Sequence, residues 1–240
     1  MTGPKRIIIA IDGPAGAGKS TIAARLARRF DLLNLETGAM YRAFALKALA
    51  NHISPDDAPA LERLAASTSI RLESTGNGNR VFLDGVEVTS SLRDTPVTEA
   101  ASRVSVHPAI RTWMVYLQRK LGETGRIVME GRDIGNAVFP DADVKIFLDA
   151  DPEVRSQRRY EQLEVAPAAA PVAPESVLKE IRERDRRDRT RALSPLKPAP
   201  DAVVIDSTHL SLDQVIERAE GIVKDRLGNY LAVSSAPSEK

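Results

Sequence analysis

The sequence of 240 residues has no cysteine and no long hydrophobic run. Without cysteine the chain can form neither a disulfide framework nor a thiolate metal site. No apolar run approaches the ~18 residues that a membrane-spanning helix requires, and residues 1–6 lead into a strand without the apolar segment of a signal peptide. We therefore expect a protein of the cytoplasm that has no membrane partner.

An excess of charge of either sign is also absent. Lysine and arginine total 34, aspartate and glutamate total 33, and the net charge is +1. A dedicated nucleic-acid-binding protein would show a strong basic excess, so we expect no nucleic-acid partner. Hydrophobic residues make up 42% of the chain, which is ordinary for a globular protein, and the length suits one domain with inserts or two small domains.

Apolar runs alternate with helical stripes along most of the chain. Residues 7–11 form an unbroken apolar run, which is typical of a parallel strand buried on both faces. We expect further strands at residues 32–35, 126–129, 144–148 and 202–205, and helices at 19–30, 39–51, 56–67, 95–105, 107–121, 152–163, 175–190 and 212–223. This alternation predicts an α/β fold with a doubly wound parallel sheet in a three-layer α/β/α arrangement.

A few segments depart from this pattern. Residues 69–73 and 80–84 alternate in polarity around the hairpin signal Gly76-Asn77-Gly78-Asn79, and they predict a small antiparallel insert, with a third strand at 86–88. Residues 165–174 are rich in alanine and proline, which predicts an irregular, flexible connection. We expect a flexible tail at residues 228–240.

A phosphate-binding motif follows the first strand. Its residues are Gly13, Pro14, Ala15, Gly16, Ala17, Gly18, Lys19 and Ser20. The glycines let the backbone approach phosphate closely, and successive N–H groups attract an anion together with the N-terminus of the next helix. Lys19 is expected to reach the β- and γ-phosphates, and the Ser20 hydroxyl to bind Mg²⁺. Because the complete motif stands between a strand and a helix, it is favoured over a plain glycine-rich turn.

Binding of a nucleoside triphosphate leaves three functions open: a kinase, a hydrolytic switch or motor, and a non-catalytic nucleotide sensor. A hydroxyl acceptor usually needs a general base, but ordinary packing at helix ends and turns explains His52, His107 and His209. Arginines are plentiful, and their planar forks suit phosphate oxygens. A phosphate acceptor is itself an anionic nucleophile, with a second pKa of about 6, and needs no base. The pattern therefore favours a kinase with two phosphorylated ligands.

Candidate arginines for a second phosphate lie on helices and behind one strand. Arg132 and Asp133 follow the strand at 126–129, at the edge where ligands bind in open α/β sheets, unless the two side chains pair only with each other. One helical face would carry Arg155, Arg158 and Arg159, and another would carry Arg184, Asp188 and Arg191.

The charged helix expected at residues 175–190 allows two interpretations. On composition alone it could be a solvated helix laced by pairs such as Asp185–Arg189. The flexible stretch beside it favours an arginine-bearing lid, which would close over the transferring phosphoryl group and exclude water. Closure of this kind separates a kinase from an ATPase.

Six sequence blocks occur in the order found in one family of kinases. Besides residues 9–20, they are ETGAMYR at 36–42, EGRDIG at 130–135, VFPDA at 138–142, RDRRDRTR at 184–191 and DST at 206–208. Over about residues 6–227 the chain resembles the bacterial cytidylate kinases, which are P-loop nucleoside monophosphate kinases. The first block is shared by P-loop proteins in general, whereas the second and third together are specific. The resemblance implies transfer of the γ-phosphoryl group of ATP to CMP or dCMP, with Mg²⁺.

The resemblance also assigns roles to individual residues. ATP would be bound by Gly13, Pro14, Ala15, Gly16, Ala17, Gly18, Lys19, Ser20, Thr21 and Arg158. The acceptor nucleotide would be bound by Thr37, Tyr41, Arg42, Ser102, Arg111, Arg132, Asp133, Arg184, Asp188 and Arg191, and transition-state charge would be stabilised by Lys19, Arg132 and Arg191. Ser102, Arg111 and Asp133 would recognise cytosine, because a carboxylate accepts a hydrogen bond from the C4 amino group that uracil lacks. Ser102 and Tyr41 could instead be plain packing residues.

The implied organisation is a single kinase domain over residues 1–240. Within it, residues 38–108 would form an insert that binds the monophosphate, and residues 152–191 a helical lid. No exposed apolar helix face stands out, so we expect a monomer. Glu36 stands where the family more often has aspartate, and we leave it out of the expected site. A kinase for another monophosphate or for a sugar-like acid is the nearest alternative, and an ATPase or switch without an acceptor is the other.

Overall fold

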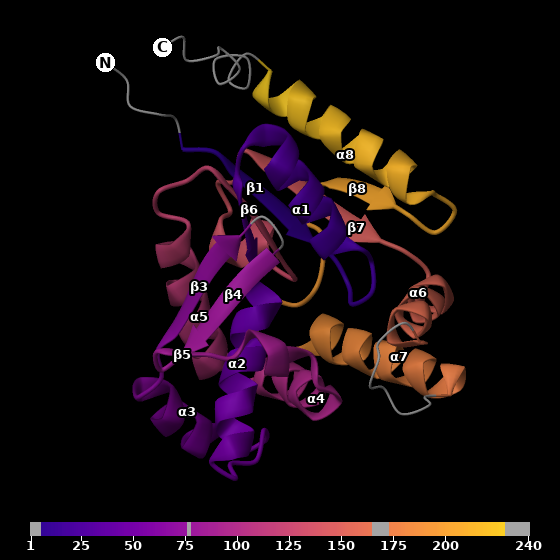
Figure 1. Cartoon of the computed structure of the whole chain (residues 1–240). Coiled ribbons are helices and arrows are strands. Elements are labelled where there is room, and N and C mark those ends of the chain that lie inside the picture. The colour runs from indigo at the N-terminus through magenta and orange to yellow at the C-terminus, as the bar shows by residue number, and fades with distance from the viewer. Residues whose placement is uncertain (1–5, 76–77, 165–172, 229–240) are drawn as a thin grey trace.

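The central sheet of the protein has five parallel strands. In the computed structural model, which describes residues 6–75, 78–164 and 173–228, they are β1 (Ile8–Asp12), β2 (Leu33–Glu36), β6 (Ile127–Gly131), β7 (Val144–Asp149) and β8 (Val203–Asp206). Their order is β2-β6-β1-β7-β8, and β1 pairs in parallel with both β6 and β7 (Figure 1). Because β1 and β6 are buried along their whole length, these apolar runs are strands covered on both faces, as predicted.

Helices cover both faces of this sheet. They include α1 (Lys19–Phe30) and α8 (Leu212–Leu227) on one face and α5 (Pro108–Leu121) on the other. Ile9 and Ile11 of β1 share a core with α1 and α8, whereas Ile8 and Ala10 share a core with partly buried side chains of α5. Side chains along a strand alternate between its faces, so one strand contributes to both cores. The predicted three-layer arrangement is confirmed.

A third hydrophobic core lies beside the central sheet. Around it lie α2 (Thr37–Ala50), α3 (Ala58–Ala66), the antiparallel strands β3 (Ile70–Thr75), β4 (Gly78–Leu83) and β5 (Val86–Glu87), the 3-10 helix η1 (Thr89–Arg93) and α4 (Thr95–Val104). Met40 and Phe44 of α2 are fully buried in it, as is Met114 of α5. The predicted antiparallel insert is confirmed, and we call this group of elements the insert core.

The side-chain amide of Asn79 joins the insert core to the central sheet. Its Nδ2 donates to the carbonyl of Asn34 at 2.6 Å, and its Oδ1 accepts from the N–H of Glu36 at 2.7 Å. Ser74 Oγ accepts a further hydrogen bond from the N–H of Asn34 at 3.2 Å. Asn34 and Glu36 belong to the edge strand β2, so the amide pairs with backbone groups that another strand could otherwise bind.

Two helices, α6 (Pro152–Glu164) and α7 (Pro174–Thr190), pack on each other away from the central sheet (Figure 1). Residues 165–172 and 229–240 lie outside the described residues, and with them most of the expected flexible connection and tail. In α7 the side chain of Asp185 is buried and pairs with Arg155 of α6, not with Arg189. The interpretation of α7 as a fully solvated helix is therefore wrong. Among the helices of the described residues, none is long and apolar enough to cross a membrane.

Candidate active site

The phosphate-binding motif forms a loop between β1 and α1. Gly18 precedes α1 with a φ of 92° and supplies no side-chain cap, so the first N–H groups of the helix are available to an anion. A Cβ on Gly13 would lie only 2.0 Å from the carbonyl oxygen of Leu148, which explains the glycine. Lys19 is 6% exposed, and its Nζ donates to the carbonyl of Pro14 at 2.7 Å. The loop therefore combines a buried ammonium with free backbone donors.

Positive charge is concentrated around Lys19. Burial, reinforced by the nearby charge of Arg132, lowers the pKa of Lys19 to about 7. Burial and Arg132 likewise lower the pKa of Arg184 to about 10. Neighbouring cations that lower one another's pKa values in this way are typical of a site that binds an anion.

Two buried carboxylates at the carboxyl ends of central strands were not among the predicted site residues. Burial raises the pKa of Asp12 to about 6, although its oxygens accept hydrogen bonds from the N–H groups of Gly135 at 2.8 Å and Ile134 at 2.7 Å. These bonds hold the start of a π-helical turn, η2 (Ile134–Val138), which the sequence did not predict. Burial also raises the pKa of Glu130. The position of both residues at the ligand-binding edge was the available signal.

The donors around Ser20 fit a magnesium ion that is held mainly by phosphates and water. No group of three or more His, Cys, Asp or Glu side chains that could hold a metal gathers within residues 6–75, 78–164 and 173–228. Ser20 lies close enough to Glu130 to oppose the rise in its pKa that burial causes, and the buried Oε1 of Glu130 has no hydrogen-bond partner among the described residues. Mg²⁺ prefers few protein ligands together with phosphate oxygens and waters, which matches one hydroxyl and one carboxylate.

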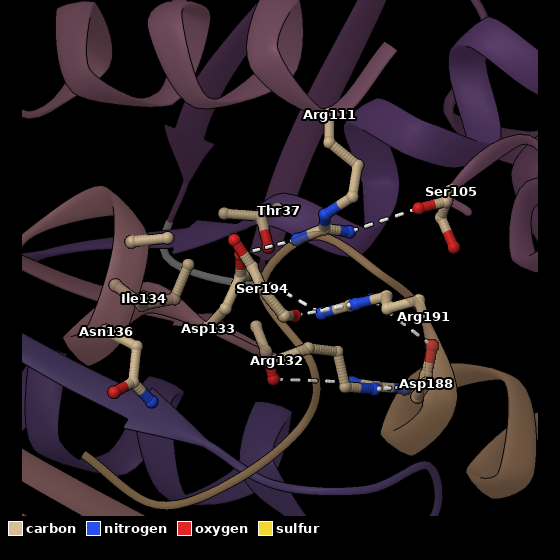
Figure 2. A network of polar contacts seen from close by, with 12 residues as sticks. Thr37, Ser105, Arg111, Arg132, Asp133, Ile134, Asn136, Asp188, Arg191 and Ser194 are labelled. Atoms are coloured by element: carbon tan, nitrogen blue, oxygen red, sulfur yellow. Dashed lines mark hydrogen bonds and ion pairs between the residues drawn. The ribbon is translucent and has the colours of Figure 1, made fainter. Parts of the chain in front are cut away.

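Five of the predicted site residues form one buried network of charges (Figure 2). Arg111 on α5, only 1% exposed, donates to Asp133 and to the carbonyl of Ser105. Arg132 Nε donates to Asp188 Oδ2 at 3.0 Å. Arg191 lies between the two pairs, 3.4 Å from Asp188 Oδ1 and 3.8 Å from Asp133 Oδ1. The alternative that Arg132 and Asp133 pair only with each other is therefore wrong.

The arginines dominate the electrostatics of this network. Burial alone would raise the pKa of Asp188, but Arg132, Arg184 and Arg191 hold it below its ordinary value. Burial, aided by the charge of Arg111, lowers the pKa of Arg191. Burial also raises the pKa of Tyr41 to about 12, against the charge of Arg111. Tyr41 therefore stays protonated and can act only as a neutral hydroxyl near these charges.

Several buried polar atoms in this region have no hydrogen-bond partner in the described part of the chain. They are Arg42 Nε, Ser102 Oγ, Arg111 Nε, Arg184 Nε and Arg191 Nη2, in addition to the Glu130 oxygen. Buried polar groups are normally hydrogen-bonded, so a concentration of such donors in one place indicates a polar ligand site. Arg42 also pairs with Glu36, and Thr37 Oγ1 donates to the carbonyl of Glu130 at 2.7 Å.

The remaining predicted residue, Arg158, lies apart from this network. Its guanidinium donates to Ser207 Oγ at 3.0 Å and to the Ser207 carbonyl at 2.7 Å. Nearby, a cavity of about 510 Å³ opens at the carboxyl ends of β7 and β8. It is lined by Asp149, Ala150, Asp151, Pro152, Arg155, Arg182, Asp185, Arg189, Val204, Asp206 and Thr208. The sequence blocks included residues 206–208 but did not predict this cavity, whose walls come from separate parts of the chain.

The parallel sheet, the phosphate-binding loop and the facing arginines define a P-loop phosphotransferase. A profile of the family "Cytidylate kinase" matches residues 9–225. The chain is 48% identical over 228 residues to a cytidylate kinase of Solibacter usitatus (strain Ellin6076), covering 95% of this chain and 97% of that protein. The chain belongs to the cytidylate kinase family.

Two further relatives support the assignment. A cytidylate kinase of Pelotomaculum thermopropionicum is 50% identical over 210 residues, which cover 87% of this chain and 92% of that protein. One of Geobacillus kaustophilus is 48% identical over 224 residues, which cover 93% and 99%. The resemblance drawn from the sequence blocks is confirmed, and so is the implied class of activity, a phosphotransferase with a phosphate group as acceptor. The roles of individual residues stay predictions.

Proposed function

We propose that this protein transfers the γ-phosphoryl group of ATP to the phosphate of CMP or dCMP, giving ADP and CDP or dCDP. The observation that carries the proposal is the buried network of Arg111, Arg132, Asp133, Asp188 and Arg191 beside Lys19. The loop around Lys19 suffices for one triphosphate. The additional arginines support a second phosphorylated ligand. The carboxylates among them indicate that this ligand also offers a hydrogen-bond donor.

The donor site is assigned to the phosphate-binding loop and the cavity beside it. Backbone N–H groups of residues 13–18, with Lys19, Ser20 and Thr21, would bind the triphosphate. The rest of ATP would occupy the cavity of about 510 Å³, a volume typical of ligand pockets. Arg158 would lie at the margin of this cavity, because it donates to Ser207, whose neighbours Asp206 and Thr208 line it. Mg²⁺ held near Ser20 and Glu130 would neutralise charge on the transferring phosphates when it is bound.

The acceptor phosphate is assigned to Arg42, Arg132 and Arg191. Each is a fork of N–H donors that suits phosphate oxygens, and two of them have a buried donor atom without a partner among the described residues. Arg184 and Asp188 on α7 would contact the ribose. Thr37 and Tyr41 would line the pocket on the opposite side.

The base is assigned to Asp133, Arg111 and Ser102. Asp133 would accept from the C4 amino group of cytosine, while Arg111 and the Ser102 hydroxyl would donate to acceptors on the ring. Uracil presents a carbonyl at the same position, which Asp133 would repel. The unpartnered Ser102 Oγ, on a residue only 4% exposed, supports a role in binding over plain packing.

No general base is required for this transfer. The acceptor phosphate is itself the nucleophile, so the protein has to align the two substrates and stabilise charge as it moves between oxygens. Lys19, Arg132 and Arg191 would do so from opposite sides of the transferring group. Residues 38–108 would act as the acceptor-binding insert and residues 152–191 as a lid that excludes water. Because the exposed large hydrophobic side chains of the described residues are scattered singly along the sequence, we propose a monomer.

An ADP-release assay with a panel of acceptors tests the proposal. CMP, dCMP, UMP, AMP, GMP and shikimate would each be offered with Mg·ATP. We expect release to depend on the acceptor and kcat/KM to be highest for CMP or dCMP. A preference for another acceptor would contradict the cytosine assignment, and hydrolysis that no acceptor stimulates would point to an ATPase or switch. Lys19→Ala is the matched control and should abolish turnover.

A further inference from the structure

Arg155 on α6 is one of the most deeply buried charged side chains of the protein. The sequence predicted that it shares one helical face with Arg158 and Arg159, and the structure shows that it is only 1% exposed. A guanidinium is expensive to bury unless its N–H groups are satisfied by protein acceptors. The acceptors that surround the guanidinium therefore indicate the role of Arg155.

Three acceptors from three separate segments surround the Arg155 guanidinium. Nε donates to the carbonyl of Ala150 after β7 at 2.7 Å, and Nη1 donates to the carbonyl of Ala15 in the phosphate-binding loop at 3.0 Å. Nη2 donates to Asp185 Oδ2 on α7 at 2.6 Å. One side chain thus links the phosphate-binding loop directly to α7.

The backbone of Arg155 meets the same loop. A Cβ on Gly16 would lie 3.1 Å from the Arg155 carbonyl oxygen and 3.2 Å from its Cβ, and Gly16 has a φ of 76° that favours glycine. The loop therefore lies directly against the first turn of α6. A shift of α6 would move the loop through packing as well as through the hydrogen bond to Ala15.

Asp185 lies in the same part of α7 as two residues of the proposed acceptor site. Arg184 precedes it and Asp188 follows three residues later, on neighbouring faces of the helix. Among the described residues, α6 and α7 share one other ion pair, between Arg182 and Glu153, whose side chains are each 58% exposed. Exposed ion pairs hold helices together only weakly. Of these two pairs, the buried Arg155–Asp185 pair is therefore the one that ties α7 to the residue in contact with the loop.

We propose that Arg155 is a positioning residue that aligns α7 with the phosphate-binding loop, so that the two substrates meet in register. This inference rests on the proposed function, because Arg184 and Asp188 bind the acceptor there. Arg155 itself contacts no reacting atom in this account. It acts through Asp185 on one side and Ala15 on the other.

The test compares Asp185→Ala and Arg155→Lys with the unaltered protein. Titration calorimetry with ADP counts binding-competent molecules, and kcat for CMP is expressed per ADP-binding site, which removes any loss of folded protein. We expect kcat per site to fall about 10- to 100-fold in Asp185→Ala, a larger factor than any rise in the Kd for ADP, because misalignment affects transfer more than donor binding. The double variant should lose no more than the worse single variant, since both interrupt the same link between α7 and the phosphate-binding loop.

Glu153→Gln is the matched control, because it removes the exposed ion pair between the same two helices. Its kcat per site should match that of the unaltered protein. A normal kcat per site in either folded variant would overturn the positioning role and leave Arg155 as a structural residue. If Asp185→Ala does not fold, Arg155→Lys, which keeps a cation beside Asp185, decides the question alone. Failure of the unaltered protein to use CMP would instead overturn the proposed function.

Discussion

Single buried charges determine how this site can bind an anion. Lys19 is buried and lies near the charge of Arg132, and both effects lower its pKa to about 7. A triphosphate placed beside it would favour the charged ammonium and raise that pKa again. Donor binding should therefore be linked to protonation of one known side chain.

Binding of ADP at pH 8 should take up about one proton per molecule, because a lysine with a pKa of about 7 is mostly neutral there. Calorimetric titrations in buffers with different ionisation enthalpies measure this number. Lys19→Arg should take up none, since its guanidinium stays charged. Equal heats in all buffers for the unaltered protein would show that Lys19 is already protonated and would contradict this account.

Asp133 is the residue on which base selection depends. Replacing it with asparagine keeps the shape of the side chain but puts an amide in place of the carboxylate that would accept a hydrogen bond from the C4 amino group. We expect the ratio of kcat/KM for CMP to that for UMP to fall about 10- to 100-fold, in line with the loss of one good base contact. Steady-state kinetics with both nucleotides give the ratio, which does not depend on the amount of folded enzyme.

Asp141→Asn provides the comparison for this experiment, because the Asp141 side chain is exposed and forms an ion pair with Arg6 at 3.7 Å. Its ratio should equal that of the unaltered protein. An unchanged ratio in Asp133→Asn would remove Asp133 from base recognition.

Several site residues could be placed from the sequence blocks, whereas the contacts of Arg155 could not be predicted from the sequence. Arg132, Asp133 and Asp188 lie in blocks with fixed spacing, and the structure brings them together. Arg155 was grouped with Arg158 because both share a helical face, yet its acceptors come from residues 15, 150 and 185. Burial of a charge depends on segments distant in sequence, which periodicity along one helix does not reveal.

At the scale of elements, the insert core is attached to the central sheet through an amide side chain. Asn79 on β4 makes two hydrogen bonds to the backbone of β2, at 2.6 and 2.7 Å. The next residues along the chain from β2 are those of α2, which carries Tyr41 and Arg42 of the proposed acceptor site. The attachment therefore connects sheet geometry to acceptor binding.

Asn79→Ala should lower the free energy of unfolding by about 1–3 kcal/mol, because it leaves two partly buried backbone groups of β2 without partners. The KM for CMP should rise, while the Kd for ADP stays the same. Urea unfolding and steady-state kinetics measure these effects. Asn51→Ala serves as the control, since that exposed amide bonds only within its own helix; an equal loss in both variants would contradict the attachment.

The order and type of the main elements followed from alternation of apolar runs with helical stripes, and the structure confirms them. The π-helical turn at 134–138 was not predictable in the same way. It depends on the Asp12 carboxylate accepting two N–H groups from residues more than a hundred positions away. Local pattern predicts helices and strands, but not an irregular turn that a distant side chain stabilises.

For the whole molecule, the proposed reaction requires two anion sites that face each other. The loop around Lys19 follows β1 and Arg132 follows the neighbouring strand β6, so their charges act on each other. The family match establishes the class of reaction. It is the relative placement of the two sites that decides whether the phosphoryl group passes to a nucleotide or to water.

The most direct test is binding of a molecule that spans both sites, adenosine and cytidine joined by five phosphates. Titration calorimetry should find one molecule per chain, bound at least about 100-fold more tightly than ADP or CMP, because its second half binds at high effective concentration. The diadenosine analogue should bind more weakly, since Asp133 selects cytosine. Affinity no better than that of ADP, or binding of CMP to protein already saturated with the spanning molecule, would contradict the account.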